Sequence, residues 1–178
     1  MSTLTSEPMS LLRVDFQELY ARHLCRHSQF GINVAHLVAL FGTWFGVYGI
    51  VYWQVRAAWP AVAHLAEGVA VTMAAGYVAA LALTGTPARV LAVTVPFLAL
   101  FLAALFWLPE LPVWVYLVLI PGFYELQSLS HKVFTAESDM TEFNKKYPKG
   151  RVLFVILLFY EVPVVLNYLV FGRKDWAA

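Results

Sequence analysis

Four histidines in this chain of 178 residues are spaced so that they could share a metal ion. His23 and His27 come just before the first long apolar run, His36 lies about one helical turn inside it, and His131 lies near the end of a later run. Neutral imidazole is a common ligand of Fe, Zn and Cu. His23 and His27 are four residues apart and are therefore neighbours on one helix face. Whether all four side chains can meet depends on the elements that carry them.

The composition indicates that those elements lie in a lipid bilayer. Hydrophobic residues make up 61% of the chain and charged residues 13%, whereas an ordinary soluble domain is about 45–50% apolar and about 25% charged. The net charge of +1 gives no reason to expect a nucleic-acid partner. The single cysteine, Cys25, excludes an internal disulfide. We therefore expect an integral membrane protein.

The apolar runs predict an all-α fold, because a membrane-spanning helix needs about 20 mostly apolar residues. We expect one domain, residues 1–178, that is a polytopic bundle of about five transmembrane helices. The predicted spans are Ile32–Trp53, Trp59–Leu83, Val90–Leu108, Val113–Phe134 and Val152–Phe171. Residues 1–31 form an interfacial N-terminal segment, residues 32–171 the bundle and residues 172–178 a tail. Apolar residues at helical spacing in the first segment predict an amphipathic helix at the membrane surface: Leu12, Phe16, Leu19 and Tyr20.

The distribution of Lys and Arg predicts a cytoplasmic N-terminus. In that orientation nine of these residues flank the cytoplasmic side and three the opposite side, as the positive-inside rule favours. The membrane would be a bacterial inner membrane or the endoplasmic reticulum. This topology brings His23, His27, His36 and His131 into one layer and leaves His64 at the opposite face. We therefore predict that the imidazoles of His23, His27, His36 and His131 form a metal site.

Polar residues near the predicted site have further expected roles. Tyr124 and Gln127 share a helix face with His131, and Gln127 is well placed to hydrogen-bond a ligating imidazole. Glu161 lies inside the last predicted span, where a carboxylate is costly. We expect it to pair with a buried polar group or to orient a ligand. Three cations near the same face are candidates for binding a carboxylate headgroup: Arg22, Arg26 and Lys132.

Two short segments of the chain resemble motifs of one known family. His27 and His36 are separated by eight residues with Asn33 between them, and the segment QSLSHKVF at residues 127–134 contains His131. In these features the chain resembles the small membrane family of iron(II)-dependent 2-hydroxy fatty acid dioxygenases. The resemblance implies that His27, His36 and His131 are catalytic iron ligands and that Asn33 supports them. The family's Asn stands one residue earlier than it does here.

These observations predict a metal-dependent membrane oxygenase, with Fe(II) as the metal and Zn as the alternative. The expected substrates are O₂ and a fatty acid or other lipid; in the resembled family a 2-hydroxy fatty acid loses one carbon. A second hypothesis is a transporter or channel for protons or metal ions, whose path would use Glu67, Glu125, Glu161 and the histidines. A third is a non-catalytic membrane assembly protein whose histidines are incidental.

Overall fold

The computed structural model describes residues 15–109, 111–134 and 151–172, and these residues form helices and no strands. The helices are α1 (Phe16–Arg26), α2 (Phe30–Ala58), α3 (Leu65–Leu83), α4 (Ala88–Trp107), α5 (Val113–Phe134) and α7 (Arg151–Phe171). The all-α prediction is confirmed for this part of the chain. The start of the predicted interfacial segment, at 1–14, and most of the predicted tail, at 173–178, lie outside the described residues.

Three helices, α2, α3 and α4, are long and apolar enough to span a membrane. Large apolar side chains in the middle of these helices point away from the protein, and Leu100 of α4 is 67% exposed. A soluble protein rarely leaves such side chains in contiguous contact with water. Lipid is the environment that suits these outward faces.

Two predicted span boundaries differ from those in the structure by more than two residues. The second helix begins at Leu65 and not at Trp59, because Pro60 disfavours helical backbone at the residue before it and His64 has a left-handed backbone, with a φ of 60°. The first helix continues to Ala58, beyond the predicted end at Trp53. Arg56 therefore belongs to the last turn of α2 and not to a loop.

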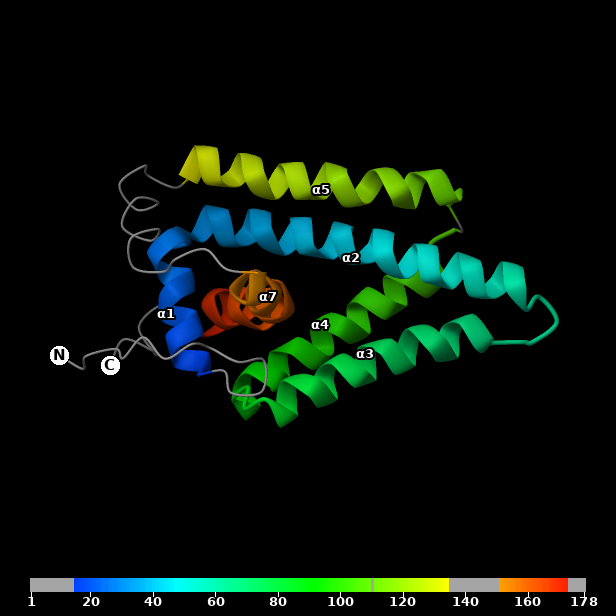
Figure 1. Cartoon of the computed structure of the whole chain (residues 1–178), viewed down its shortest axis with the longest axis horizontal. Helices are drawn as coiled ribbons and strands as arrows, with labels where there is room; N and C mark the ends of the chain where they lie inside the picture. Colours follow the sequence, from blue (N-terminus) through cyan, green and yellow to red (C-terminus); the bar gives the residue numbers. More distant parts are fainter. Residues whose placement is uncertain (1–14, 110, 135–150, 173–178) are drawn as a thin grey trace.

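Helices α2 and α5 lie side by side along most of their length (Figure 1). Four glycines of α2 face α5 and allow this close approach: Gly31, Gly42, Gly46 and Gly49. A Cβ atom at Gly42 would lie 2.1 Å from the ring of Phe123, and one at Gly49 would lie 2.3 Å from the ring of Tyr116. At Gly46 the obstacle is backbone, because a Cβ there would lie 2.9 Å from the carbonyl oxygen of Tyr116. Small residues often permit such contacts between membrane helices.

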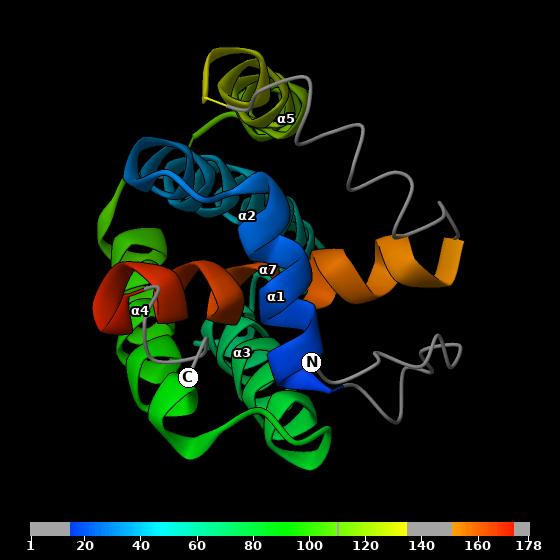
Figure 2. The ribbon, with the colours of Figure 1, turned by 90° about the vertical axis from the view of Figure 1, so that its left-hand side faces the viewer.

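Helix α7 runs crosswise to α2 and α5, so it is seen almost end-on in Figure 1 and from the side in Figure 2. The last predicted span, Val152–Phe171, is therefore helical but does not run alongside the others. The crossing is stabilised by burial on both sides of α7. Val162 and Val165 join a core cluster with Leu40 of α2, while Tyr160 joins a second cluster with Leu19 of α1.

Helix α1 lies at the same end of the bundle as the middle of α7 (Figure 2). The Asp15 carboxylate caps it by accepting hydrogen bonds from the backbone N–H groups of Gln17 and Glu18. Its buried face carries Tyr20 and His23. A helix is thus present in the predicted N-terminal segment, and it directs one histidine into the protein.

Candidate metal centre

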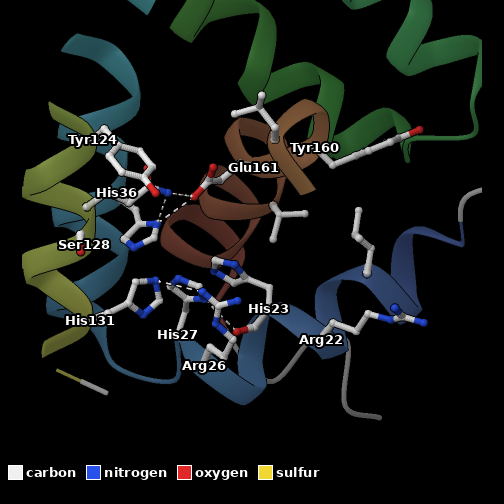
Figure 3. Close-up of a pocket in the computed structure, with 14 residues that line it drawn as sticks. Arg22, His23, Arg26, His27, His36, Tyr124, Ser128, His131, Tyr160 and Glu161 are labelled. Atoms are coloured by element: carbon white, nitrogen blue, oxygen red, sulfur yellow. Dashed lines mark hydrogen bonds and ion pairs between the residues drawn. The ribbon is translucent and has the colours of Figure 1, made fainter. Parts of the chain in front are cut away.

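Three histidines from three different elements converge at one end of the bundle (Figure 3). His27 is the C-cap residue of α1, His36 lies in the second turn of α2, and His131 lies in the last turn of α5. The ring centroids are 4.4 Å apart for His27 and His36, 4.8 Å for His27 and His131, and 5.0 Å for His36 and His131. The predicted convergence of these three imidazoles is confirmed.

The nitrogen atoms of this histidine group are close enough to share one ion. One ligand atom from each residue lies within 4.8 Å of the others. Two nitrogens that each bind an ion at about 2.1 Å are at most about 4.2 Å apart. A pair 4.8 Å apart therefore has to approach by at least about 0.6 Å when an ion binds.

Hydrogen bonds fix which nitrogen of two rings is available. His27 Nδ1 donates to the backbone oxygen of His23 at 3.1 Å, and His36 Nδ1 donates to Oε1 of Glu161 at 2.9 Å. Each ring then has an unprotonated Nε2. Both Nε2 atoms are buried and have no hydrogen-bond partner among the described residues. A buried lone pair without a donor is costly, and a metal ion would satisfy both.

Glu161 holds the His36 ring from the crossing helix α7. Its Oε1 accepts a second hydrogen bond from Nε2 of Gln127, which comes from α5. Three helices therefore meet at one carboxylate. This arrangement of carboxylate, imidazole and open Nε2 is the one that usually orients a ligating histidine and increases its basicity.

His23 is adjacent to the histidine group but engages another partner. Its ring stacks on that of His27, with centroids 4.1 Å apart and an angle of 3° between the planes. Its Nε2 donates to Oδ1 of Asn33 at 2.7 Å, while Nδ2 of Asn33 donates to the backbone oxygens of His27 and Gln29, both at 2.8 Å. The structure therefore places His23 outside the group of three and gives Asn33 the role of holding the α1–α2 connection.

Burial keeps the imidazoles of His23 and His27 neutral, and the neutral imidazole is the form that binds metals. Burial lowers the pKa of His23 to about 3, from an ordinary value of 6.5. Burial, and then the neighbouring imidazole of His23, lowers the pKa of His27 well below its ordinary range. Neither ring is protonated at neutral pH.

The buried His23 predicts that stability depends on pH. Between pH 6.5 and about 3 the unfolded chain binds a proton at this ring and the folded chain does not. The free energy of unfolding should therefore fall as the pH drops through that window, by up to about 1.4 kcal/mol per pH unit from this group. Unfolding in detergent at several pH values measures the slope. His23→Gln, which keeps a donor toward Asn33, should flatten it, and an unchanged slope would contradict the assignment.

The three predicted headgroup cations occupy different environments. Nη2 of Arg26 lies 3.2 Å from Nε2 of His131. Arg22 lines the same cavity but forms an ion pair with Glu18, one turn earlier in α1. Lys132 is exposed and does not line the cavity. Arg26 therefore hydrogen-bonds the histidine group.

A cavity of about 470 Å³ opens beside the histidine group. Its wall combines the polar cluster with apolar side chains from α1 and α7, chiefly Leu19, Leu158 and Val164. Tyr124 also lines it, and this side chain is 59% exposed. Its role in supporting a ligand stays a prediction. The apolar wall could not be predicted from the sequence, because nothing in the α7 segment indicates that it crosses the bundle here.

Two other residues that were singled out from the sequence lie away from this centre. Glu67 accepts a hydrogen bond from the hydroxyl of Tyr52 at 2.7 Å, near His64 at the start of α3. Glu125 is exposed on α5 and does not line the cavity. As predicted, His64 does not join the other histidines.

The Glu161 carboxylate should make a measurable contribution to metal affinity. We expect Glu161→Gln to weaken binding of a divalent metal by about 10- to 100-fold, because the amide oxygen can accept the hydrogen bond from His36 but carries no charge. Glu125→Gln removes an exposed carboxylate from the same protein and serves as the control. Titration of both variants with Co²⁺, followed by absorption, measures the difference, and equal affinities would argue against this role.

Chemically, the centre offers three imidazoles and no thiolate, beside a cavity that is apolar on one side. Three protein ligands leave positions on a metal open for other molecules, as in catalytic rather than structural sites. Comparison of the chain with protein-family models, with curated proteins and with solved structures finds no significant match, so a function has to be argued from this geometry and chemistry.

Proposed function

We propose that this protein is a metal-dependent membrane oxygenase, with Fe(II) bound by His27, His36 and His131. The observation that carries the proposal is the pair of buried Nε2 atoms, on His27 and His36, that lack a partner and lie beside an amphipathic cavity. Imidazole ligands suit iron and zinc alike. The resemblance of the two histidine segments to iron(II)-dependent dioxygenases favours iron, and zinc is the alternative.

The cavity supports a fatty acyl substrate. Apolar side chains such as Leu158 and Val164 can hold an acyl chain, while the polar wall faces the headgroup. Bound iron would supply the activation of O₂. The protein's own part is to hold the imidazoles in fixed tautomers, through Glu161 and the backbone oxygen of His23.

The reaction that we propose shortens a 2-hydroxy fatty acid by one carbon. The bond between C1 and C2 breaks, C1 leaves as carbon dioxide, and C2 becomes the carboxyl carbon of the shorter acid. The substrate loses four electrons, and one O₂ accepts them. In the overall balance, one oxygen atom from O₂ is incorporated into the carbon-containing products, and one molecule of water is formed. No further reductant is needed.

The proposed topology places the centre at the cytoplasmic side of a bacterial inner membrane or of the endoplasmic reticulum. Helices α2 to α5 would cross the bilayer. Helices α1 and α7 would lie near the membrane surface, where α7 closes the cavity and Glu161 reaches the histidines without being deep in lipid. The chain would then cross the membrane four times, and not about five times as expected from the sequence.

A transport function is less well supported. The histidine group and the Tyr52–Glu67 pair lie toward opposite ends of α2. The interior between them is filled by aromatic rings of one core cluster, which includes Phe45, Tyr48, Phe101 and Tyr116. A proton or ion path would need polar groups or water at this depth. An assembly protein whose histidines are incidental does not need His27 and His36 to be held in tautomers that leave both Nε2 atoms open.

The proposal is tested on purified protein in detergent. We expect about one iron per chain after anaerobic loading, and O₂ uptake that requires both iron and a 2-hydroxy acid such as 2-hydroxyhexadecanoate. Hexadecanoate is the matched control that lacks the hydroxyl group. Ion flux in liposomes without O₂ uptake would favour the transporter, and absence of bound metal would favour the assembly protein.

A further inference from the structure

A row of aromatic side chains connects the cavity with the end of α2 that lies away from the histidine group. Helix α2 extends from the histidine group to the start of α3 (Figure 1). The row begins in the cavity wall and ends near the start of α3, and we call it the aromatic row: Tyr160, Phe159, Tyr77, Trp44, Tyr48 and Tyr52. All members except Phe159 are tyrosine or tryptophan, the side chains of this kind that lose an electron most readily.

Neighbouring rings of the aromatic row lie close together. The ring centroid of Phe159 is 5.1 Å from that of Tyr160 and 5.1 Å from that of Tyr77. The centroids of Tyr77 and Trp44 are 4.9 Å apart, and those of Trp44 and Tyr48 are 6.0 Å apart. Electrons cross gaps of this size between side chains. The packed rings that obstruct an ion path therefore offer a path for electrons.

The row ends at a tyrosine whose phenol proton has a basic acceptor. Tyr52 follows Tyr48 by four residues and is its neighbour on one face of α2. The Tyr52 hydroxyl donates to Oε1 of Glu67 at 2.7 Å. The hydroxyls of Tyr77 and Tyr160 instead donate to a backbone carbonyl oxygen and to another hydroxyl, which are not bases. An oxidised phenol is a strong acid, so Tyr52 is where the oxidised state is stabilised by proton transfer.

We propose that the aromatic row carries electrons from Tyr52 to the cavity, with Glu67 as the proton acceptor at its entry. After an oxidant in the cavity takes one electron from the row, the vacancy moves to Tyr52. One electron leaves the phenol ring, the O–H bond breaks, and the proton goes to Oε1 of Glu67. A one-electron donor of the hydroquinone class at that end returns the electron, and Glu67 returns the proton.

The path would protect the site from an oxidant that has not reacted with a substrate. The oxidant in question is a one-electron oxidant derived from O₂, so this protective role rests on the proposed oxygenase. The path itself does not depend on that proposal, because it is built from side chains that are distinct from the histidine group.

The path is tested by light-driven oxidation of the full-length protein in detergent, without added metal. Cys25, the only cysteine, lies in the last turn of α1 beside the histidine group and can carry a ruthenium polypyridyl label. A flash, with pentaamminechlorocobalt(III) as irreversible electron acceptor, makes the label a one-electron oxidant. We expect electron paramagnetic resonance to show a neutral tyrosyl radical that Tyr52→Phe removes. Tyr116→Phe alters a tyrosine of the same core outside the row and should retain the radical. An unchanged radical in Tyr52→Phe would overturn the proposal.

Two further variants test the middle of the row and the proton acceptor. Trp44→Phe keeps a ring that is much harder to oxidise, so the Tyr52 radical should form at least about tenfold more slowly, equal to about 1.4 kcal/mol of activation free energy. Glu67→Gln keeps an acceptor for the Tyr52 hydroxyl but removes the base, so the yield of the radical should fall. Glu125→Gln, an exposed carboxylate of α5, is the control. An unchanged rate in Trp44→Phe, or an unchanged yield in Glu67→Gln, would overturn the proposal.

Spin trapping in the wild type keeps the proposal testable if a variant fails to fold. A nitroso spin trap is present during the flash, and peptide mapping then locates the adduct. An adduct on Tyr52 supports the path, and adducts confined to Tyr20 or Tyr160, at the labelled end, would overturn it. O₂ uptake without a radical at Tyr52 would overturn this inference and leave the oxygenase intact. A radical at Tyr52 without O₂ uptake would overturn the oxygenase and leave the path intact.

Discussion

Replacing His131 by alanine is expected to remove the bound metal. Structural sites with about four ligands have apparent binding energies of about 10–16 kcal/mol, so the loss of one ligand should weaken binding by at least about 100-fold. The wild type should contain about one iron per chain after loading and desalting, and the variant should contain almost none. His131 is the proposed ligand that lies about a hundred residues after the other two, so this variant tests the convergence of the segments directly.

The matched control for this experiment is His64→Asn. His64 lies at the start of α3, away from the histidine group, and asparagine tolerates its left-handed backbone, with a φ of 60°. Metal should also stabilise the wild type and the control against heat, by about 2.7 kcal/mol at a concentration of 100 times Kd. His131→Ala should show no such gain. Full metal occupancy in that variant would remove His131 from the site.

Substitution of Gly46 by alanine is expected to destabilise the pair of helices that carries the site. The added Cβ would lie 2.9 Å from the carbonyl oxygen of Tyr116. Backbone cannot rotate away as a side chain can, so α2 and α5 must separate. Overpacking of this kind costs about 1–3 kcal/mol of unfolding free energy. Metal affinity should fall as well, because α2 carries His36 and α5 carries His131.

Gly76→Ala is the control, because a Cβ at this position of α3 meets no atom within 4 Å. It should leave stability unchanged or increase it slightly, since alanine is favoured over glycine inside a helix. Thermal unfolding of both variants in the same detergent measures the difference. Equal stability would show that the contact between α2 and α5 tolerates a wider spacing.

The sequence predicted the helices because apolar runs of about 20 residues and their breaks are local features. It also predicted the meeting of His27, His36 and His131, because alternating spans return every second helix end to the same face. The ends of the helices were harder to predict from the sequence. The start of α3 depends on Pro60 and on the left-handed backbone of His64, which the apolar pattern does not reveal.

The direction of α7 could not be predicted from its sequence. The segment is apolar around its circumference, which fits a helix along the bundle as well as one across it. Its crossing is decided by valines that pack on α2 and α4, residues far away in the chain. That crossing brings Glu161 to His36, although its position along the segment had indicated a place deep in a span.

What the sequence alone determined is the kind of site: several imidazoles, few charges, and a topology that gathers them at one face. Only the tertiary structure decided which nitrogen atoms are available, because hydrogen-bond partners come from segments up to 125 residues apart. Asn33 engages His23, Glu161 orients His36, and Arg26 meets His131. A hydrophobic pattern fixes which face of a helix is buried, but the partner that each buried polar atom meets depends on how the helices cross.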